Sequence, residues 1–160
     1  MLWTQPCMLV TASRDGNVKI WRVTDGISGD DNSKVTVKEV FRFTPVCKGD
    51  KKVEAVTTST FAPSTMTIQH DGKSWDHGVL AIGMESGLIE IWAVPLGGIT
   101  SHQPRLLLSI PLQDCHIGIV KSLAWKPVKT DESSLTLASC STDHGVRFFR
   151  VTLPGNMDVF

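Results

Sequence analysis

The chain has 160 residues, of which 16 are Lys or Arg and 16 are Asp or Glu, so its formal net charge is +0. This balance argues against binding nucleic acid through bulk positive charge. No apolar run approaches the roughly 20 residues that span a bilayer, and the N-terminus lacks the basic start and long apolar core of a signal peptide. The sequence therefore predicts a soluble intracellular protein that does not enter a membrane.

The first predicted element is a β-hairpin over residues 9–23. Alternating apolar side chains flank Asp15-Gly16, a pair that favours the positive φ of a tight turn. The same pattern returns at residues 80–94 and 137–151, which indicates a repeat architecture. The aligned pairs are Ile20-Trp21, Ile91-Trp92 and Phe148-Phe149.

Further strands are predicted between the hairpins. An inner strand precedes the second and third copies, at residues 53–61 and 117–125, and outer strands lie at 35–43 and 105–110. Val56, Phe61 and Pro63 of the first inner strand align with Val120, Trp125 and Pro127 of the second. No segment carries the 3.6-residue periodicity of a helix. Loops are expected at 25–34, 63–77, 95–104 and 126–134, and residues 152–160 are expected to form a frayed tail.

These repeats resemble the WD-repeat β-propeller family. The family pattern combines a Gly-His pair, an inner strand that ends in an aromatic-x-Pro corner, and a hairpin with Asp in its turn and Ile-Trp in its second strand. Residues that fit this pattern are Thr11, Asp15, Val18, Ile20, Trp21, His116, Trp125-Lys126-Pro127, Leu137-Ala138-Ser139, Asp143 and Val146. The spacing between copies exceeds the about 40–45 residues of a usual WD repeat, so each unit would carry an insertion.

The resemblance implies an all-β fold: a partial WD-repeat β-propeller of about three antiparallel blades, with the first and last incomplete. The expected blades are residues 8–43, 53–110 and 117–151 of a single domain, 1–160. In this family His, Ser/Thr, Asp and Trp often form one hydrogen-bonded network in a blade. The blade-structural residues implied here are Thr11, Asp15, Trp21, Trp92, His116, Ser139 and Asp143.

The sequence departs from the family pattern in each copy. Ser86 replaces the turn Asp in the second copy, Phe149 replaces the Trp in the third, and the first copy has no inner strand. No blade therefore holds all four members of the network. Because a propeller needs about 4–8 blades to close, we expect a piece of a larger propeller or a truncated product, whose partners include the remaining blades.

We expect no catalytic, cofactor-binding or metal site. Cys115-His116 could be a thiol with its base, but neighbours in a strand point apart and no orienting third group is evident. Cys140 and His144 could ligate zinc, which needs four converging ligands. In both cases a structural role is favoured. The predicted interaction rim instead consists of exposed loop residues, namely Arg14, Lys48, Lys51, Lys52, Trp75 and Glu85.

Within the WD-repeat family, three segments resemble the WD-repeat subunits of the Elongator complex. They are residues 12–21, residues 74–78 running into 80–85, and residues 116–127 together with 137–144. The resemblance implies a non-catalytic scaffold, in the cytoplasm and nucleus, that binds the other Elongator subunits. It would support modification of the tRNA wobble uridine and be associated with transcription elongation, with little or no direct nucleic-acid contact.

The alternative is another WD-repeat adaptor, such as a substrate receptor of a ubiquitin ligase. Such receptors carry Trp-Asp-x-Arg at the end of a blade. This chain has Trp21-Arg22-Val23 and Trp92-Ala93-Val94 at those positions, which weakens the alternative.

Overall fold

The computed structural model describes residues 7–25, 35–45, 53–70, 73–96, 102–127, 134–152 and 157–158. Within these ranges the chain forms eleven β-strands and no helix. The strands are β1 (Cys7–Ala12), β2 (Val18–Asp25), β3 (Val35–Phe43), β4 (Val56–His70), β5 (Lys73–Met84), β6 (Ile89–Pro95), β7 (Arg105–Ser109), β8 (Val120–Trp125), β9 (Ser134–Ser141), β10 (Val146–Thr152) and β11 (Met157–Asp158). None of the described residues forms a helix that could cross a membrane.

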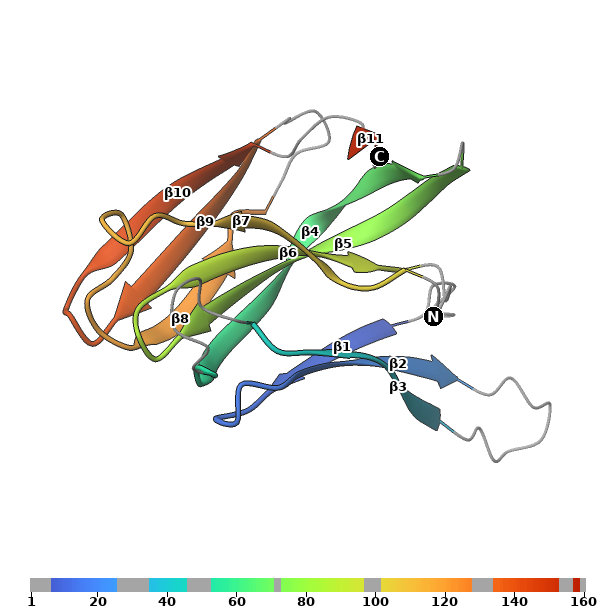
Figure 1. Ribbon diagram of the computed structural model, residues 1–160, viewed down its shortest axis with the longest axis horizontal. Helices are drawn as coiled ribbons and strands as arrows, with labels where there is room; N and C mark the ends of the chain where they lie inside the picture. The colour runs from blue at the N-terminus through green and yellow to red at the C-terminus, as the bar shows by residue number, and fades with distance from the viewer. Residues whose placement is uncertain are drawn as a thin grey trace.

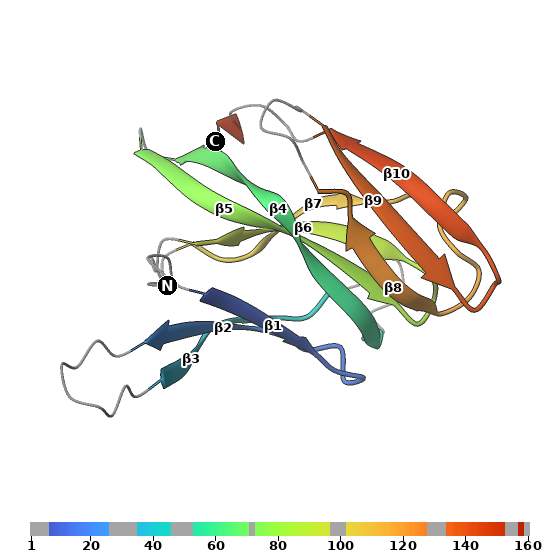
Figure 2. The same ribbon diagram turned by 180° about the vertical axis from the view of Figure 1, so that it is seen from behind.

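The strands make three sheets that follow one another along the chain, except that β11 returns to the second sheet. The first has the order β1-β2-β3, the second β11-β4-β5-β6-β7 and the third β10-β9-β8. Every pairing is antiparallel except that of β11 with β4. Figures 1 and 2 show the sheets arranged side by side like blades, with the second in the middle. The fold is thus an all-β partial propeller, and among the described residues the first and third sheets each have one strand fewer than the four of β4 to β7.

Two apolar cores hold the three sheets together. The first lies between the first and second sheets and includes Ile20, Phe41, Leu80, Ile82 and Val94. The second lies between the second and third sheets and includes Val79, Ala81, Ile91, Leu135 and Leu137. Successive side chains of a strand point to opposite faces, so the middle sheet contributes one face to each core.

The hairpin turns depend on backbone conformations that favour glycine. Gly16 and Gly87 have φ of 76° and 96°, values that a Cβ makes costly. A Cβ on Gly87 would also clash with the backbone oxygen of His116. In the third hairpin the equivalent residue is His144, which adopts φ of 61° despite its side chain.

The expected loop at residues 63–77 is wrong. β4 continues to His70 and β5 begins at Lys73, so this stretch extends the hairpin of the second sheet. The register shifts between Phe61 and Thr65, and this irregularity accommodates Pro63, which cannot donate to a ladder. The alternation of exposed Thr65 and Thr67 with buried Met66 and Ile68 resumes after it.

Part of the tail expected at residues 152–160 also lies in β-strands. Thr152 ends β10, and Met157–Asp158 pairs with Ile68 and Gln69 at the edge of β4. A two-residue segment such as Met157–Asp158 can pair with an exposed sheet edge through its backbone alone. The composition of the tail therefore does not predict this pairing.

Candidate interaction surface

The third sheet contains a buried hydrogen-bonded chain of three side chains. His116 Nδ1 lies 2.9 Å from Asp143 Oδ2, and His116 Nε2 lies 2.7 Å from Ser139 Oγ. A carboxylate can only accept, so Nδ1 carries the proton. Asp143 also accepts from the backbone N–H of Ile117 at 3.2 Å and of Gly145 at 2.9 Å. The chain therefore ties the entry to β8 to strand β9 and to the β9–β10 turn.

The carboxyl group of Asp143 is held in its charged form. Burial raises the pKa of Asp143, but hydrogen bonds from Gly145, His116 and Ile117 outweigh burial and lower it to about 2. Donors that bind the charged form favour ionisation. Near neutral pH this residue is an anion that anchors the histidine.

The connectivity Ser139–His116–Asp143 matches that of a serine-hydrolase triad, but its surroundings differ. Ser139 is 2% exposed and His116 3% exposed, so a substrate cannot reach the hydroxyl. Cys115 is also buried, and its thiol donates to the backbone oxygen of Ile110 at 3.4 Å. Burial raises the pKa of Cys115, which keeps it a protonated thiol and a poor nucleophile. The observed partners of these groups are all within the chain, namely other side chains of the third sheet and the backbone oxygen of Ile110.

The other two hairpins contain parts of the same kind of network. In the first, Trp21 Nε1–H donates to Thr11 Oγ1 at 2.8 Å, and Asp15 Oδ1 accepts from the backbone N–H of Asn17 at 3.0 Å. In the second, Trp92 Nε1–H donates to Glu90 Oε2 at 2.9 Å. The predicted blade residues thus make hydrogen bonds, but they are divided among three sheets.

Glutamates at two positions take roles that sequence reasoning missed. Glu90 accepts from Trp92 in the second hairpin, where the first hairpin uses a threonine. Ser86, which replaces the turn Asp, donates to Glu54 Oε2 at 2.6 Å. No local sequence signal marks either glutamate, because each becomes an acceptor only through the neighbour that the fold places beside it. No group of three His, Cys, Asp or Glu side chains suited to a metal gathers among the described residues.

Two of the predicted rim residues come together at one end of the molecule. Arg14 follows β1 and Glu85 follows β5, both are exposed, and both line a depression of about 330 Å³. Lys121 at the start of β8 lines it as well. Thr57 also lines this depression. Its Oγ1–H donates a hydrogen bond to the backbone oxygen of Val120 at 2.6 Å, and this bond connects β4 to β8. Lys48, Lys51 and Lys52 lie outside the described residues.

Trp75 lies elsewhere. It is near the start of β5, at the end opposite Glu85, and its half-buried ring meets His102 edge-on with centroids 5.3 Å apart. His77 Nδ1–H donates to the backbone oxygen of Trp75 at 3.0 Å, and burial lowers the pKa of His77. Trp75 therefore does not share a surface with Arg14 and Glu85.

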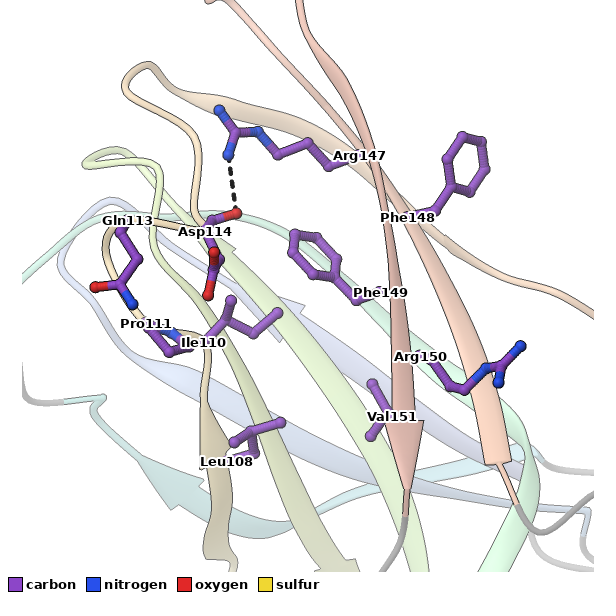
Figure 3. Close-up of a pocket in the computed structure, with 10 residues that line it drawn as sticks. All are labelled: Leu108, Ile110, Pro111, Gln113, Asp114, Arg147, Phe148, Phe149, Arg150 and Val151. Atoms are coloured by element: carbon purple, nitrogen blue, oxygen red, sulfur yellow. Dashed lines mark hydrogen bonds between the residues drawn. The ribbon is translucent and has the colours of Figure 1, made fainter.

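A second concavity, of about 610 Å³, lies between β7 and β10. Figure 3 shows Phe149 pointing into it and Phe148 pointing away from it. Arg147 Nη1–H donates to the backbone oxygen of Asp114 at 2.9 Å across the concavity. The alignment of Phe148-Phe149 with the pairs of the other hairpins did not reveal this groove, although adjacent strand residues must face opposite ways.

Comparison with known proteins gives a consistent set of relatives. No protein-family model matches the chain. It is 32% identical over a match of 146 residues, which covers 87% of this chain, to Elongator complex protein 2 of Arabidopsis thaliana. The identity is 30% over 143 residues, 89% of the chain, for the Schizosaccharomyces pombe protein of that name. For the Drosophila melanogaster protein it is 28% over 144 residues, 90% of the chain.

The chain is much shorter than these relatives, since it spans 15% of the length of each of the three. The similarity covers almost the whole of this chain and includes all three sheets. By sequence, this chain is similar to one segment of Elongator complex protein 2.

Proposed function

We propose that this chain is a non-catalytic WD-repeat scaffold of the Elongator complex. In this proposal each sheet is one blade, at residues 8–43, 53–110 and 117–151, and the chain binds the other Elongator subunits in the cytoplasm and nucleus. Its role is to support modification of the tRNA wobble uridine, with an associated role in transcription elongation, through contacts between proteins.

The observation that carries the proposal is the similarity over 87% to 90% of the chain to three proteins named Elongator complex protein 2. Ser139 and Cys115 are both buried, so neither side chain is accessible to a substrate. Their burial supports a structural role over a catalytic one. The chain has as many acidic as basic residues, which supports binding to protein over binding to nucleic acid.

The surface we assign to a partner subunit is the depression flanked by Arg14, Glu85 and Lys121. Exposed loop residues on a rigid sheet scaffold are the usual carriers of binding. Charges on either side of a small hollow favour a polar partner segment, since complementary charge fixes register and partner choice.

The test is affinity capture of the tagged chain from its own cells, followed by mass spectrometry. Elongator subunits should be enriched, and Arg14→Glu combined with Glu85→Lys should reduce their recovery at least tenfold. Leu112→Glu, which replaces another exposed loop residue that does not line the depression, should leave recovery unchanged. Capture of a ubiquitin-ligase adaptor in place of Elongator subunits would refute the proposal and favour the alternative adaptor.

A further inference from the structure

Two exposed aliphatic residues occupy the same position of the repeat. Val53 lies just before β4 and Ile117 lies just before β8, and the interval between them along the chain is the one that separates Val56 from Val120. Val53 is 50% exposed and Ile117 is 89% exposed. Single exposed apolar side chains are common on any protein surface. Exposure of two at one equivalent position of the repeat instead indicates a shared role.

Both residues belong to segments that link neighbouring sheets and cross the glycine turn of the preceding one. A Cβ on Gly16 would meet Val53 Cγ1. A Cβ on Gly87 would likewise meet the backbone oxygen of Gly118, next to Ile117. Figure 1 shows the β1–β2 and β5–β6 turns at the same end of their sheets. Each segment has a sheet of this chain on both sides, so blades packed against the outer faces would not lie next to it.

Equivalent hydrogen bonds hold the two segments in place. The backbone oxygen of Ala55 accepts from the N–H of Glu85 at 3.0 Å, and that of Ile119 accepts from the N–H of Thr142 at 3.0 Å. A surface that is already fixed in this way loses little conformational freedom when a partner binds, which favours affinity.

The two aliphatic residues lie beside the depression that carries the predicted rim residues. Ala55 lines the depression two residues after Val53, and Ile119 lines it two residues after Ile117. One aliphatic side chain therefore comes from the segment between the first and second sheets. The other comes from the segment between the second and third sheets.

The depression itself presents charges that are free to pair with a partner. Arg14, Glu85 and Lys121 are exposed and line it. Among the residues that the structure describes, none of these three side chains makes an ion pair. Complementary charges placed opposite them would fix the register of a bound segment.

We propose that this surface binds one extended segment of a partner Elongator subunit, with apolar side chains at its ends and charged side chains between them. The inference rests on the proposed function. The apolar ends cover Val53 and Ile117. An acidic side chain lies opposite Arg14 and Lys121, and a basic one lies opposite Glu85. The occupant is protein because a nucleic acid would bring only negative charge to Glu85 and would not need two aliphatic contacts.

The experiment is quantitative affinity capture of the tagged protein from its own cells. Val53→Asp and Ile117→Asp should each lower recovery of the bound Elongator subunit at least tenfold, because each places a charge under an apolar side chain of the partner. Ile117→Val should retain recovery. Leu112→Asp is the matched control, since this exposed leucine lies between Pro111 and Gln113, which line the other concavity. Serine replaces aspartate in any variant that is not recovered as soluble protein.

The outcomes separate this inference from the proposed function. Equal recovery from the wild type and from both aspartate variants would overturn the inference and leave the proposed function standing. If the wild type recovers no Elongator subunit, the proposed function fails and the inference fails with it.

Photochemical cross-linking tests the chemistry of the occupant. A p-benzoylphenylalanine in place of Val53 or of Ile117 should cross-link to one short segment of a single subunit, with acidic and basic residues between the two cross-linked positions. Cross-links to two different subunits, to nucleic acid or to another part of the same chain would overturn the proposal.

Discussion

At the scale of single residues, one buried imidazole makes hydrogen bonds to two other residues of the third sheet. His116 contacts Ser139 and Asp143, and Asp143 in turn accepts two backbone N–H groups. Ser139→Ala removes the hydroxyl 2.7 Å from His116 Nε2 and leaves that nitrogen buried without a partner. We expect a loss of about 1–3 kcal/mol of unfolding free energy. Urea unfolding measures it, with exposed Ser122→Ala as the control; equal losses in both variants would contradict a role for the network.

The charge on Asp143 makes the same network sensitive to acid. Its pKa is lowered from 3.8 to about 2 in the folded chain, so the folded state binds its proton more weakly than the unfolded state. Its contribution to stability is present above about pH 4 and is lost as the pH falls toward 2. Asp143→Asn should flatten the dependence of the urea midpoint on pH in this window. An unchanged slope in the variant would show that other carboxyl groups cause the acid sensitivity.

At the scale of elements, the third hairpin carries a strained turn that the other two avoid. His144 has φ of 61° where Gly16 and Gly87 stand in the equivalent turns. A side chain in the left-handed region costs roughly 1–2 kcal/mol, so His144→Gly should raise the unfolding free energy by about 1 kcal/mol. His144→Ala keeps the Cβ and should give no gain. Thermal unfolding of both variants decides the matter, and a gain from alanine as large as that from glycine would exclude backbone strain as the cause.

The same elements show which features the sequence could predict. The hairpins were predictable because alternation and Gly turns are local signals, and the His116, Ser139 and Asp143 positions followed from the family pattern. The long β4–β5 extension was missed because Pro63 and Gly78 resemble breakers, although the register shift lets the ladder pass Pro63. Glu90 and Glu54 were missed because an acceptor can come from any position that the fold brings near, and spacing along the chain does not encode this.

At the scale of the whole molecule, stability depends on how closely neighbouring sheets approach each other. Gly83 on β5 lies where the second sheet meets the third, and a Cβ there would stand 2.7 Å from Val120 Cγ1 and 2.9 Å from Thr58 Cγ2. Gly78 on the same strand offers a matched position, since its nearest contacts, to Leu96 and Phe61, would be 3.2 Å. Adding a methyl group to a closely packed core forces backbone shifts or side chains out of their rotamers.

Gly83→Ala should therefore cost about 1–3 kcal/mol of unfolding free energy, and Gly78→Ala should cost distinctly less because flexible side chains can yield. Tryptophan fluorescence and far-ultraviolet circular dichroism would follow unfolding in urea. Both probes should shift to the same lower midpoint in Gly83→Ala, because each outer sheet shares a core with the middle one and no sheet can unfold without exposing a core. Separate midpoints for the two probes would mean that the sheets are independent, and that the contact between the second and third sheets does not stabilise the first.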